Sequence, residues 1–467
     1  MSKLKTYNNY QPVTYDYISQ LPDGWQLLPN IAIFQERIER GHINEELLSV
    51  TIGKGVIKQT DVDIKKDSSN EDKSKYKLIK VGDIAYNKMR MWQGALGYSD
   101  FQGISSPAYV ILKPKMKINP RYFHYMFRTS FYTNYSKRFS YGIVDDQLSL
   151  RYTDFKRMYS IVPHLSVQNS IVAYLDKKNN EIDKFIRNKE RLIELLEEQR
   201  NYELEKLLFR GYDNSVNFKN TGIEYLPNIP KHWELFKIKF ISKINPGKPT
   251  NRYSKNSLQE VVFLPMEKVS ENGTILNDIK RPIKEVWSGY TFFAKNDIIM
   301  AKITPCFENG KGAFLNELET EIGFGTTEFH VLRASKRIEP MFLHQILRTR
   351  RFKTLGEENM QGSAGQQRVP TDFLKNFPIG IPPKSEQIII LDLIQEINTQ
   401  TDLIISKAQK EISSIKEYRE ALITDLVTGK RKVDNVYNDS NNDFAVAAEG
   451  AVAYGNVKGF SQSFNKK

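Results

Sequence analysis

The chain has 467 residues, of which 40% are hydrophobic and 12% aromatic, so packed cores are expected and disorder of the whole chain is excluded. Lys and Arg number 68 against 55 Asp and Glu, and the resulting net charge of +13 favours nucleic acid as a partner over a membrane surface. No apolar run approaches the roughly 20 residues of a membrane-spanning helix. The polar N-terminus and the single cysteine, Cys306, exclude a disulfide framework and predict a cytoplasmic protein.

The sequence contains an internal repeat at an offset of 208 to 220 residues. Six short motifs occur twice and in the same order, which chance does not readily produce. The pairs are Tyr17…Pro22…Trp25 with Tyr225…Pro230…Trp233; Gly82–Ile84 with Asn296–Ile298; Ala108–Lys113 with Glu328–Arg333; Arg121–His124 with Met341–His344; Thr153–Phe155 with Thr371–Phe373; and Pro163–Gln168 with Pro382–Gln387.

Each copy begins with a mixed region of strands, polar glycine-containing loops and short helices. Runs rich in β-branched and aromatic residues predict strands, and segments that begin near a proline predict helices. In chain order the expected elements are strands at 81–89 and 108–113, a helix at 120–135, strands at 261–266, 297–303 and 328–333, and a helix at 340–353.

Each copy ends in one long predicted helix, about 166–209 and 385–428, with a narrow apolar stripe and neither Gly nor Pro. Ser166 and Ser385 are suited to cap the starts, and Gly211 and Gly429 to end the helices in a left-handed conformation. At ~1.5 Å per residue each helix is roughly 60 Å long, so its stripe needs a partner helix. We therefore expect the two helices to pack on each other, in antiparallel orientation because the linker between the copies is short.

The predicted fold class is α+β: two pseudo-repeated mixed α/β domains separated by two long helices packed as an antiparallel coiled coil. The predicted segments are an N-terminal arm at 1–20, a first α/β domain at 21–165, the first long helix at 166–210, a linker at 211–222, a second α/β domain at 223–384, the second long helix at 385–428, and a polar, loosely ordered tail at 429–467.

Sequence patterns of catalytic sites are missing. Gly323–Gly325 and Asn119–Tyr122 are the strings nearest to the cofactor and base-binding loops of amino-methyltransferases, but they lack the spacing and the second proline. A phosphate-binding loop is missing as well. The six histidines lack ligand spacing, and we interpret the matching pair His124 and His344 as structural. The sequence therefore predicts neither catalytic nor metal-binding residues.

Taken together, the motifs resemble the specificity subunit of type I restriction-modification systems over about residues 15–430. The resemblance is carried by the two Tyr…Pro-x-x-Trp motifs, by Gly82–Ile84, by the glycine- and glutamine-rich segment Gly362–Val369, and by Ile381–Gln387 at the start of a long helix. The first copy departs from the pattern, because it has Val167–Gln168 in place of Glu-Gln and Tyr141–Gln147 in place of the glycine–glutamine run.

The resemblance implies that each mixed domain is a target recognition domain for one half of a split DNA sequence, with the long helices as a spacer. It also implies double-stranded DNA, two modification subunits and restriction subunits as partners. The chain would then be a non-catalytic DNA-recognition subunit of an enzyme complex. The partner subunits would bind S-adenosylmethionine, ATP and Mg and would perform adenine methylation and cleavage.

Candidate DNA-contacting residues follow from the chemistry of the major groove, where Arg or Lys recognises guanine and Asn or Gln recognises adenine. Such side chains gather where predicted strands give way to loops, and Lys88 and Lys302 occupy matching positions. The candidates are Lys88, Arg90, Gln93, Tyr141 and Gln147 in the first copy, and Lys302, Thr304, Lys311, Gln366, Gln367 and Arg368 in the second. Trp25 and Trp233 are expected in the core.

Two other functions remain open from the sequence. A free-standing two-headed DNA-binding regulator or architectural protein would bind its site tightly without partner subunits. An enzyme with an unrecognised nuclease site would show metal-dependent cleavage as a pure chain.

Overall fold

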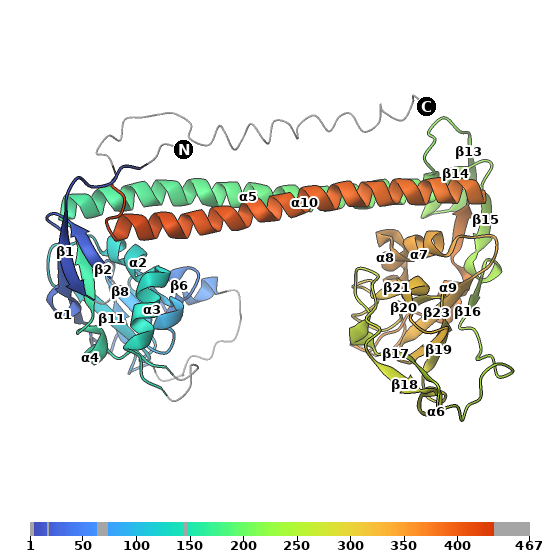
Figure 1. Cartoon of the computed structure of the whole chain (residues 1–467), viewed down its shortest axis with the longest axis horizontal. Coiled ribbons are helices and arrows are strands. Elements are labelled where there is room, and N and C mark those ends of the chain that lie inside the picture. Colours follow the sequence, from blue (N-terminus) through green and yellow to red (C-terminus); the bar gives the residue numbers. More distant parts are fainter. Residues whose placement is uncertain (1–3, 16–17, 63–72, 143–147, 364, 434–467) are drawn as a thin grey trace. The chain divides into compact units, whose positions relative to one another are not determined.

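A computed structural model describes residues 4–15, 18–62, 73–142, 148–363 and 365–433 (Figure 1). The chain divides into two compact units, Met1–Asn188 with Lys410–Lys467 and Lys189–Gln409. Both long helices therefore contribute residues to both units. Gln147 and the predicted tail beyond residue 433 lie outside the described residues.

The first unit contains a four-stranded antiparallel sheet in the order β4-β11-β8-β9, three two-stranded pairs in addition to a terminal hairpin, and short helices. The hairpin consists of β1 (Tyr10–Tyr15) and β2 (Ile18–Pro22), so the predicted N-terminal arm is largely a strand pair. The other elements are β3 (Gln26–Pro29), α1 (Asn30–Ile33), β4 (Phe34–Glu36), β5 (Leu48–Thr51), β6 (Gly55–Lys58), β7 (Lys77–Ile79), β8 (Ile84–Asn87), β9 (Leu96–Tyr98), β10 (Gly103–Ser105), β11 (Tyr109–Pro114), α2 (Pro120–Arg128), α3 (Ser130–Arg138), α4 (Tyr152–Phe155) and β12 (Tyr159–Val162).

The second unit contains a four-stranded sheet in the corresponding order β16-β23-β20-β21 and another in the order β18-β17-β22-β19. It also begins with a hairpin, which places β13 (Phe218–Ile223) partly in the predicted linker. The other elements are β14 (Leu226–Pro230), β15 (Glu234–Lys237), β16 (Ser242–Ile244), β17 (Glu260–Leu264), β18 (Lys280–Pro282), α6 (Ile283–Val286), β19 (Thr291–Ala294), β20 (Ile298–Ala301), β21 (Gly312–Phe314), β22 (Ile322–Gly325), β23 (Phe329–Ala334), α7 (Pro340–Arg348), α8 (Arg350–Glu358), α9 (Thr371–Asn376) and β24 (Pro378–Ile381).

The strand pairing of the two copies corresponds residue by residue at the motifs found in the sequence. The hairpins pair Tyr10 with Pro22 and Phe218 with Pro230, and both change register before their turns. The pairing of β3 with β12 corresponds to that of β15 with β24. Trp25 and Trp233 are buried next to these pairs, as expected for core residues.

The long helices α5 (Leu165–Arg210) and α10 (Lys384–Val427) match the predicted ranges to within one residue. In the first unit Asp183 of α5 contacts Arg419 of α10, and in the second unit Arg200 contacts Asp402 at 2.7 Å. Because the residue numbers rise along α5 while those of its partners fall along α10, the helices run antiparallel. Among the described residues, none of the helices is long and apolar enough to cross a membrane.

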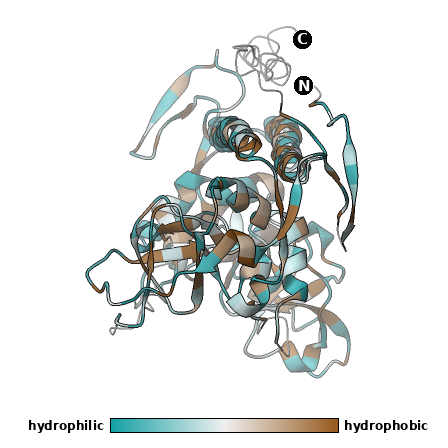
Figure 2. Cartoon of the chain, turned by 90° about the vertical axis from the view of Figure 1, so that its left-hand side faces the viewer, coloured by the Kyte–Doolittle hydropathy of each residue, from teal (hydrophilic) through white to brown (hydrophobic). Residues whose placement is uncertain are grey.

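Buried apolar residues lie mainly on strands and helices of each unit, and hydrophilic residues are spread over much of the outer chain (Figure 2). A buried glutamine fixes the start of each long helix to the mixed region of the same copy. Gln168 Oε1 accepts a hydrogen bond from the backbone N–H of Asn119 at 2.8 Å, next to the start of α2. Gln387 Oε1 accepts the corresponding bond from Glu339 at 2.7 Å, next to the start of α7.

The structure corrects the predicted short helices and the predicted serine caps. The helices predicted at 120–135 and 340–353 are each two helices, interrupted at Thr129 and Thr349, whose hydroxyls accept hydrogen bonds from the first turn of the next helix. Ser166 and Ser385 lie inside their helices, which begin one residue earlier. The left-handed ends are confirmed, because Gly211 and Gly429 have φ values of 78° and 75°.

Candidate nucleic-acid interface

Lys88 and Lys302 follow the central strands β8 and β20 and occupy the same position in both copies. The N–H of Lys88 donates to Ala108 O at 3.3 Å, and its carbonyl accepts from Leu150 at 2.9 Å. The N–H of Lys302 donates to Glu328 O at 2.9 Å, and its carbonyl accepts from Val369 at 2.8 Å. Each lysine therefore joins the end of a central strand to a distant loop of its own copy.

In the second unit these contacts bring two candidate loops together, after β20 and before α9. The N–H of Thr304 donates to Gln367 O at 3.0 Å, and Ile303 forms an isolated bridge with Arg368. Lys302, Thr304, Gln366, Gln367 and Arg368, which are far apart in sequence, therefore form one cluster. Lys311 directly precedes β21, the strand that pairs with β20 in a hairpin, and its Nζ donates to Met266 O at 3.5 Å.

In the first unit the corresponding loop returns through a bridge between Tyr141 and Ser149. Tyr141 is 65% exposed, and Arg90 and Gln93 are exposed in the segment after Lys88. Burial, together with the charge of Lys77, lowers the pKa of the half-buried Lys88. The candidates Lys88, Arg90, Gln93 and Tyr141 therefore all lie on the loops that leave and return to β8.

Besides Lys311, two candidates have side-chain partners within the protein. The guanidinium of Arg368 donates to both carboxylate oxygens of Glu328 at 2.9 Å, and this ion pair lowers the pKa of Glu328. The hydroxyl of Thr304 donates to Gln367 O at 3.2 Å. To contact a DNA base, Arg368 would have to break its ion pair with Glu328. The side chain of Gln366 is exposed and could contact a base without breaking such an ion pair.

The structure adds Trp92 and Lys137, which sequence reasoning missed, to the candidate surface. The Lys137 ammonium lies 4.9 Å from the centre of the Trp92 ring, next to Arg90 and Gln93. The mixture of basic, aromatic and amide residues in Lys88–Gln93 is a signal that could have pointed to Trp92. Lys137 is brought there by α3, which the sequence alone does not place.

Metal ligands do not gather in the described part of the chain, which contains no group of three His, Cys, Asp or Glu side chains suited to hold an ion. Of the matching histidines, His344 is buried and His124 half-buried. His124 Nδ1 accepts a hydrogen bond from the N–H of Tyr98 at 3.1 Å, whereas neither ring nitrogen of His344 has a hydrogen-bond partner among the described residues. Burial and neighbouring arginines lower the pKa of each imidazole to about 3.

Residues 230–414 match the type I restriction modification DNA specificity domain. The chain is 35% identical over 203 residues to the EcoEI specificity subunit of the type I restriction enzyme of Escherichia coli, and 37% identical over 198 residues to that of EcoAI. The two alignments cover 43% and 42% of this chain and about a third of the length of each relative.

Two solved structures share the fold. A chain from a study of complex assembly and conformational transition of the type I R-M system has a TM-score of 0.66 at 14% identity, over 88% of this chain and 99% of that one. The HsdS subunit of Thermoanaerobacter tengcongensis has a TM-score of 0.52 at 15% identity, over 90% and 99%. Residues 230–414 are thus similar to the type I restriction modification DNA specificity domain, and the chain is similar in sequence to the specificity subunits of two type I restriction enzymes.

Proposed function

We propose that the chain is the DNA-recognition subunit of a type I restriction-modification complex, in which each mixed domain recognises one half of a bipartite target. The observation that carries the proposal is the duplicated position of the candidate loops. In both copies a lysine after the central strand joins a second loop through the same pair of backbone hydrogen bonds. One chain therefore carries two equivalent loop surfaces, and each of them could recognise one half of a bipartite target.

The chemistry of these loops supports base recognition in the major groove. Arg and Lys form hydrogen bonds with guanine, and Gln forms a bidentate pair with adenine. The loops carry Arg90 and Gln93 in the first copy, and Lys302, Gln366 and Gln367 in the second. Contacts to phosphate would position the domain without selecting a sequence.

The antiparallel helices would set the gap between the half-targets. The 46 residues of α5 correspond to about 69 Å at 1.5 Å per residue. Half-targets on one face of B-DNA lie about one helical turn apart, roughly 34 Å, or a multiple of it. A helix pair of this length would keep two recognition domains apart while leaving helix flanks for partner subunits.

The methylation and cleavage reactions would belong to the partners. Two modification subunits would bind S-adenosylmethionine and flip the target adenine, and restriction subunits would use ATP and Mg to translocate and cleave DNA. The chain itself would supply the sequence specificity and remain in the cytoplasm with these partners.

The test is to express the chain with its modification subunits in a host that lacks other DNA methylation and to map methylated adenines genome-wide. The expected result is one bipartite motif with two fixed half-sequences and a fixed gap. The matched control replaces residues 21–165 with another first domain and should change one half-sequence only. Methylation without such a motif, or tight site-specific binding by the pure chain alone, would contradict the proposal and favour a free-standing regulator.

A further inference from the structure

A Gly–His–Arg anchor holds an exposed turn against the mixed domain of each copy. In the first unit it consists of Gly55, His124 and Arg128. The Arg128 guanidinium donates to Ile52 O at 2.6 Å and Gly53 O at 2.7 Å, and therefore fixes the turn at 51–55. A Cβ added at Gly55 would lie 3.4 Å from His124 Cε1, so this histidine packs directly on the turn.

The second unit has the same anchor, formed by Gly273, His344 and Arg348. Arg348 donates to Asn272 O at 2.9 Å and Glu271 O at 3.1 Å, and thereby fixes the turn at 270–274. A Cβ at Gly273 would lie 2.8 Å from Arg348 Nη1 and 3.2 Å from His344 Cε1. Both glycines have positive φ values, 75° for Gly55 and 88° for Gly273, a conformation that favours glycine.

The two turns share their construction although their sequences differ. In the first, Thr51 Oγ1 accepts from the N–H of Lys54 at 3.1 Å; in the second, Ser270 Oγ accepts from the N–H of Asn272 at 3.2 Å. The residues at the tips, Ile52–Lys54 and Glu271–Asn272, are exposed. A repeated, largely half-buried anchor therefore supports a tip whose side chains vary between the copies, which is the arrangement expected of a specificity element on a fixed framework.

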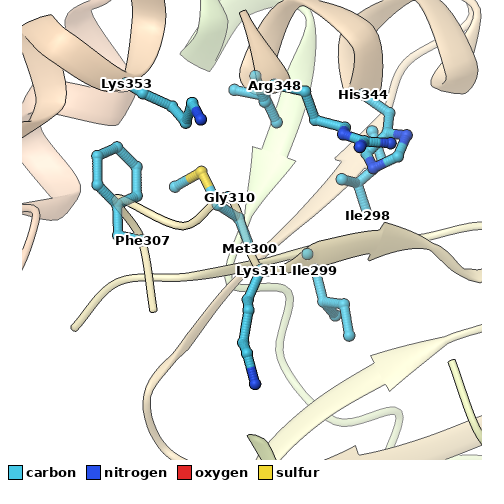
Figure 3. A pocket seen from close by; sticks show the side chains of 11 residues that line it. Ile298, Ile299, Met300, Phe307, Gly310, Lys311, His344, Arg348 and Lys353 are labelled. Atoms are coloured by element: carbon cyan, nitrogen blue, oxygen red, sulfur yellow. The ribbon is translucent and has the colours of Figure 1, made fainter. Parts of the chain in front are cut away.

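The anchor also connects the turn to the candidate recognition loops. Arg128 Nη1 donates to Leu96 O at 3.0 Å, three residues beyond Gln93 on the same hairpin. In the second unit Arg348 and His344 line one small cavity with Gly310 and Lys311 of the β20–β21 hairpin. Figure 3 shows Arg348 and His344 above this hairpin, with the Lys311 side chain directed away from them.

We infer that the turns 51–55 and 270–274 are additional recognition loops, and that Arg128 and Arg348 are positioning residues that hold them toward DNA. The inference rests on the proposed function and deepens it by naming a specificity element in each copy. Asn272 is the tip residue suited to a bidentate contact with adenine. Arg348 acts through the backbone of the turn and does not itself contact a base.

The test measures methylation of a DNA library, with each half-target randomised in turn, by the complete complex with its modification subunits. Arg348→Met keeps the length of the side chain but removes its donors. It should relax base preference about 5- to 100-fold at one or two positions of the second half-target, the range expected for one base contact. Arg348→Lys should restore part of the preference. Asn272→Ala should relax the same positions without changing the unfolding midpoint.

The first half-target is the internal control and should be unchanged in all three variants, whereas Arg128→Met should alter the first half-target alone. If Arg348→Met does not fold, Asn272→Ala still tests whether the turn 270–274 contributes to base preference. Two results would overturn the inference. One is an unchanged base preference in Asn272→Ala, and the other is a methylation rate in Arg348→Met that decreases by the same factor for all library members. A wild-type complex without any bipartite preference would overturn the proposed function, and the inference with it.

Discussion

At the scale of single residues, His124 and His344 show how burial fixes a protonation state. His344 is buried and His124 half-buried, each beside an arginine one helical turn further on, Arg348 or Arg128, and both stay neutral because their pKa falls to about 3. The arginines retain their charge and bind backbone carbonyls. A neutral histidine can pack on a glycine turn, whereas a protonated one would place a second cation next to the guanidinium.

The histidines should make stability depend on pH. In the unfolded chain each titrates near 6.5, and in the folded chain near 3, so the unfolded state binds more protons between these values. Each histidine's contribution is complete above pH 6.5 and is lost as the pH falls. Between pH 7 and pH 5 the free energy of unfolding should drop by about 2 kcal/mol per histidine.

The measurement is urea unfolding across this pH range, monitored by circular dichroism. His344→Gln should remove one histidine's share of this loss, and the double variant with His124→Gln should remove two. The buried His330, whose pKa is also lowered by burial, should keep part of the slope. An unchanged slope in the double variant would show that other groups carry the pH dependence.

The buried aspartates of the repeated motif are a second case at this scale. Asp297 is 1% exposed and receives two hydrogen bonds from Arg333 at 2.7 Å, and Asp83 pairs in the same way with Arg37. Asp297→Asn should lower the free energy of unfolding by about 1 to 3 kcal/mol, because a charge-assisted pair is lost. The exposed Asp278, paired with Lys268, is the matched control, and Asp278→Asn should leave the unfolding midpoint unchanged. If the two substitutions lowered the unfolding midpoint equally, burial would not explain the contribution of Asp297.

At the scale of elements, the end of each long helix packs on the Pro-x-x-Trp motif of one copy. A Cβ at Gly429, after α10, would lie 2.6 Å from two ring carbons of Pro22 and 3.2 Å from Trp25. A Cβ at Gly211, after α5, would lie 3.2 Å from Trp233 and 3.1 Å from Glu386 Oε1. The helix that follows one copy therefore ends against the other copy, and glycine permits both the left-handed turn and the close approach.

This contact predicts a difference between two glycines of the same conformation. Gly24 and Gly429 have φ values of 79° and 75°, but a Cβ at Gly24 would meet nothing within 4 Å. Gly24→Ala should cost about 1 kcal/mol through backbone strain alone. Gly429→Ala should cost about 2 to 4 kcal/mol, because the Pro22 ring must also move. Equal losses in chemical denaturation would mean that the helix end does not depend on this contact.

The sequence predicted the long helices well because their 3.6-residue period continues without Gly or Pro for over forty residues. It failed where a local hydrogen bond decides the structure: Thr129 and Thr349 interrupt predicted helices by accepting from the next helix. The predicted strand 81–89 begins only at Ile84, because Gly82 adopts a φ of 90° in the preceding turn.

The candidate site was only partly predictable for a related reason. Lys302 could be found from its position after a strand motif, and the structure places it beside Gln366–Arg368. The ion pair of Arg368 with Glu328 depends on two residues 40 positions apart, which a linear pattern does not join. The turns at 51–55 and 270–274 were missed because their anchors, Arg128 and Arg348, lie on helices about 75 residues further along the chain.

At the scale of the whole molecule, the helix contacts define a register that an experiment can shift. Asp183 contacts Arg419 and Arg200 contacts Asp402. In both pairs the two residue numbers have the same sum, so α5 and α10 keep one register along their length. An insertion in one helix alone would disrupt this register. Equal insertions at paired positions would preserve the contacts on both sides, because each unit retains its own halves of the two helices.

If the helix pair sets the gap, inserting seven residues after Lys189 and seven after Ser413 should lengthen it without altering either half-sequence. Two helical turns add about 10 Å, which corresponds to about three base pairs of B-DNA. Methylation mapping of the complete complex measures the gap directly. The matched control carries seven substitutions at exposed positions of the same helix segments and should keep the original gap. A lengthened helix pair that still directs methylation at the original gap would show that these helices do not measure the distance.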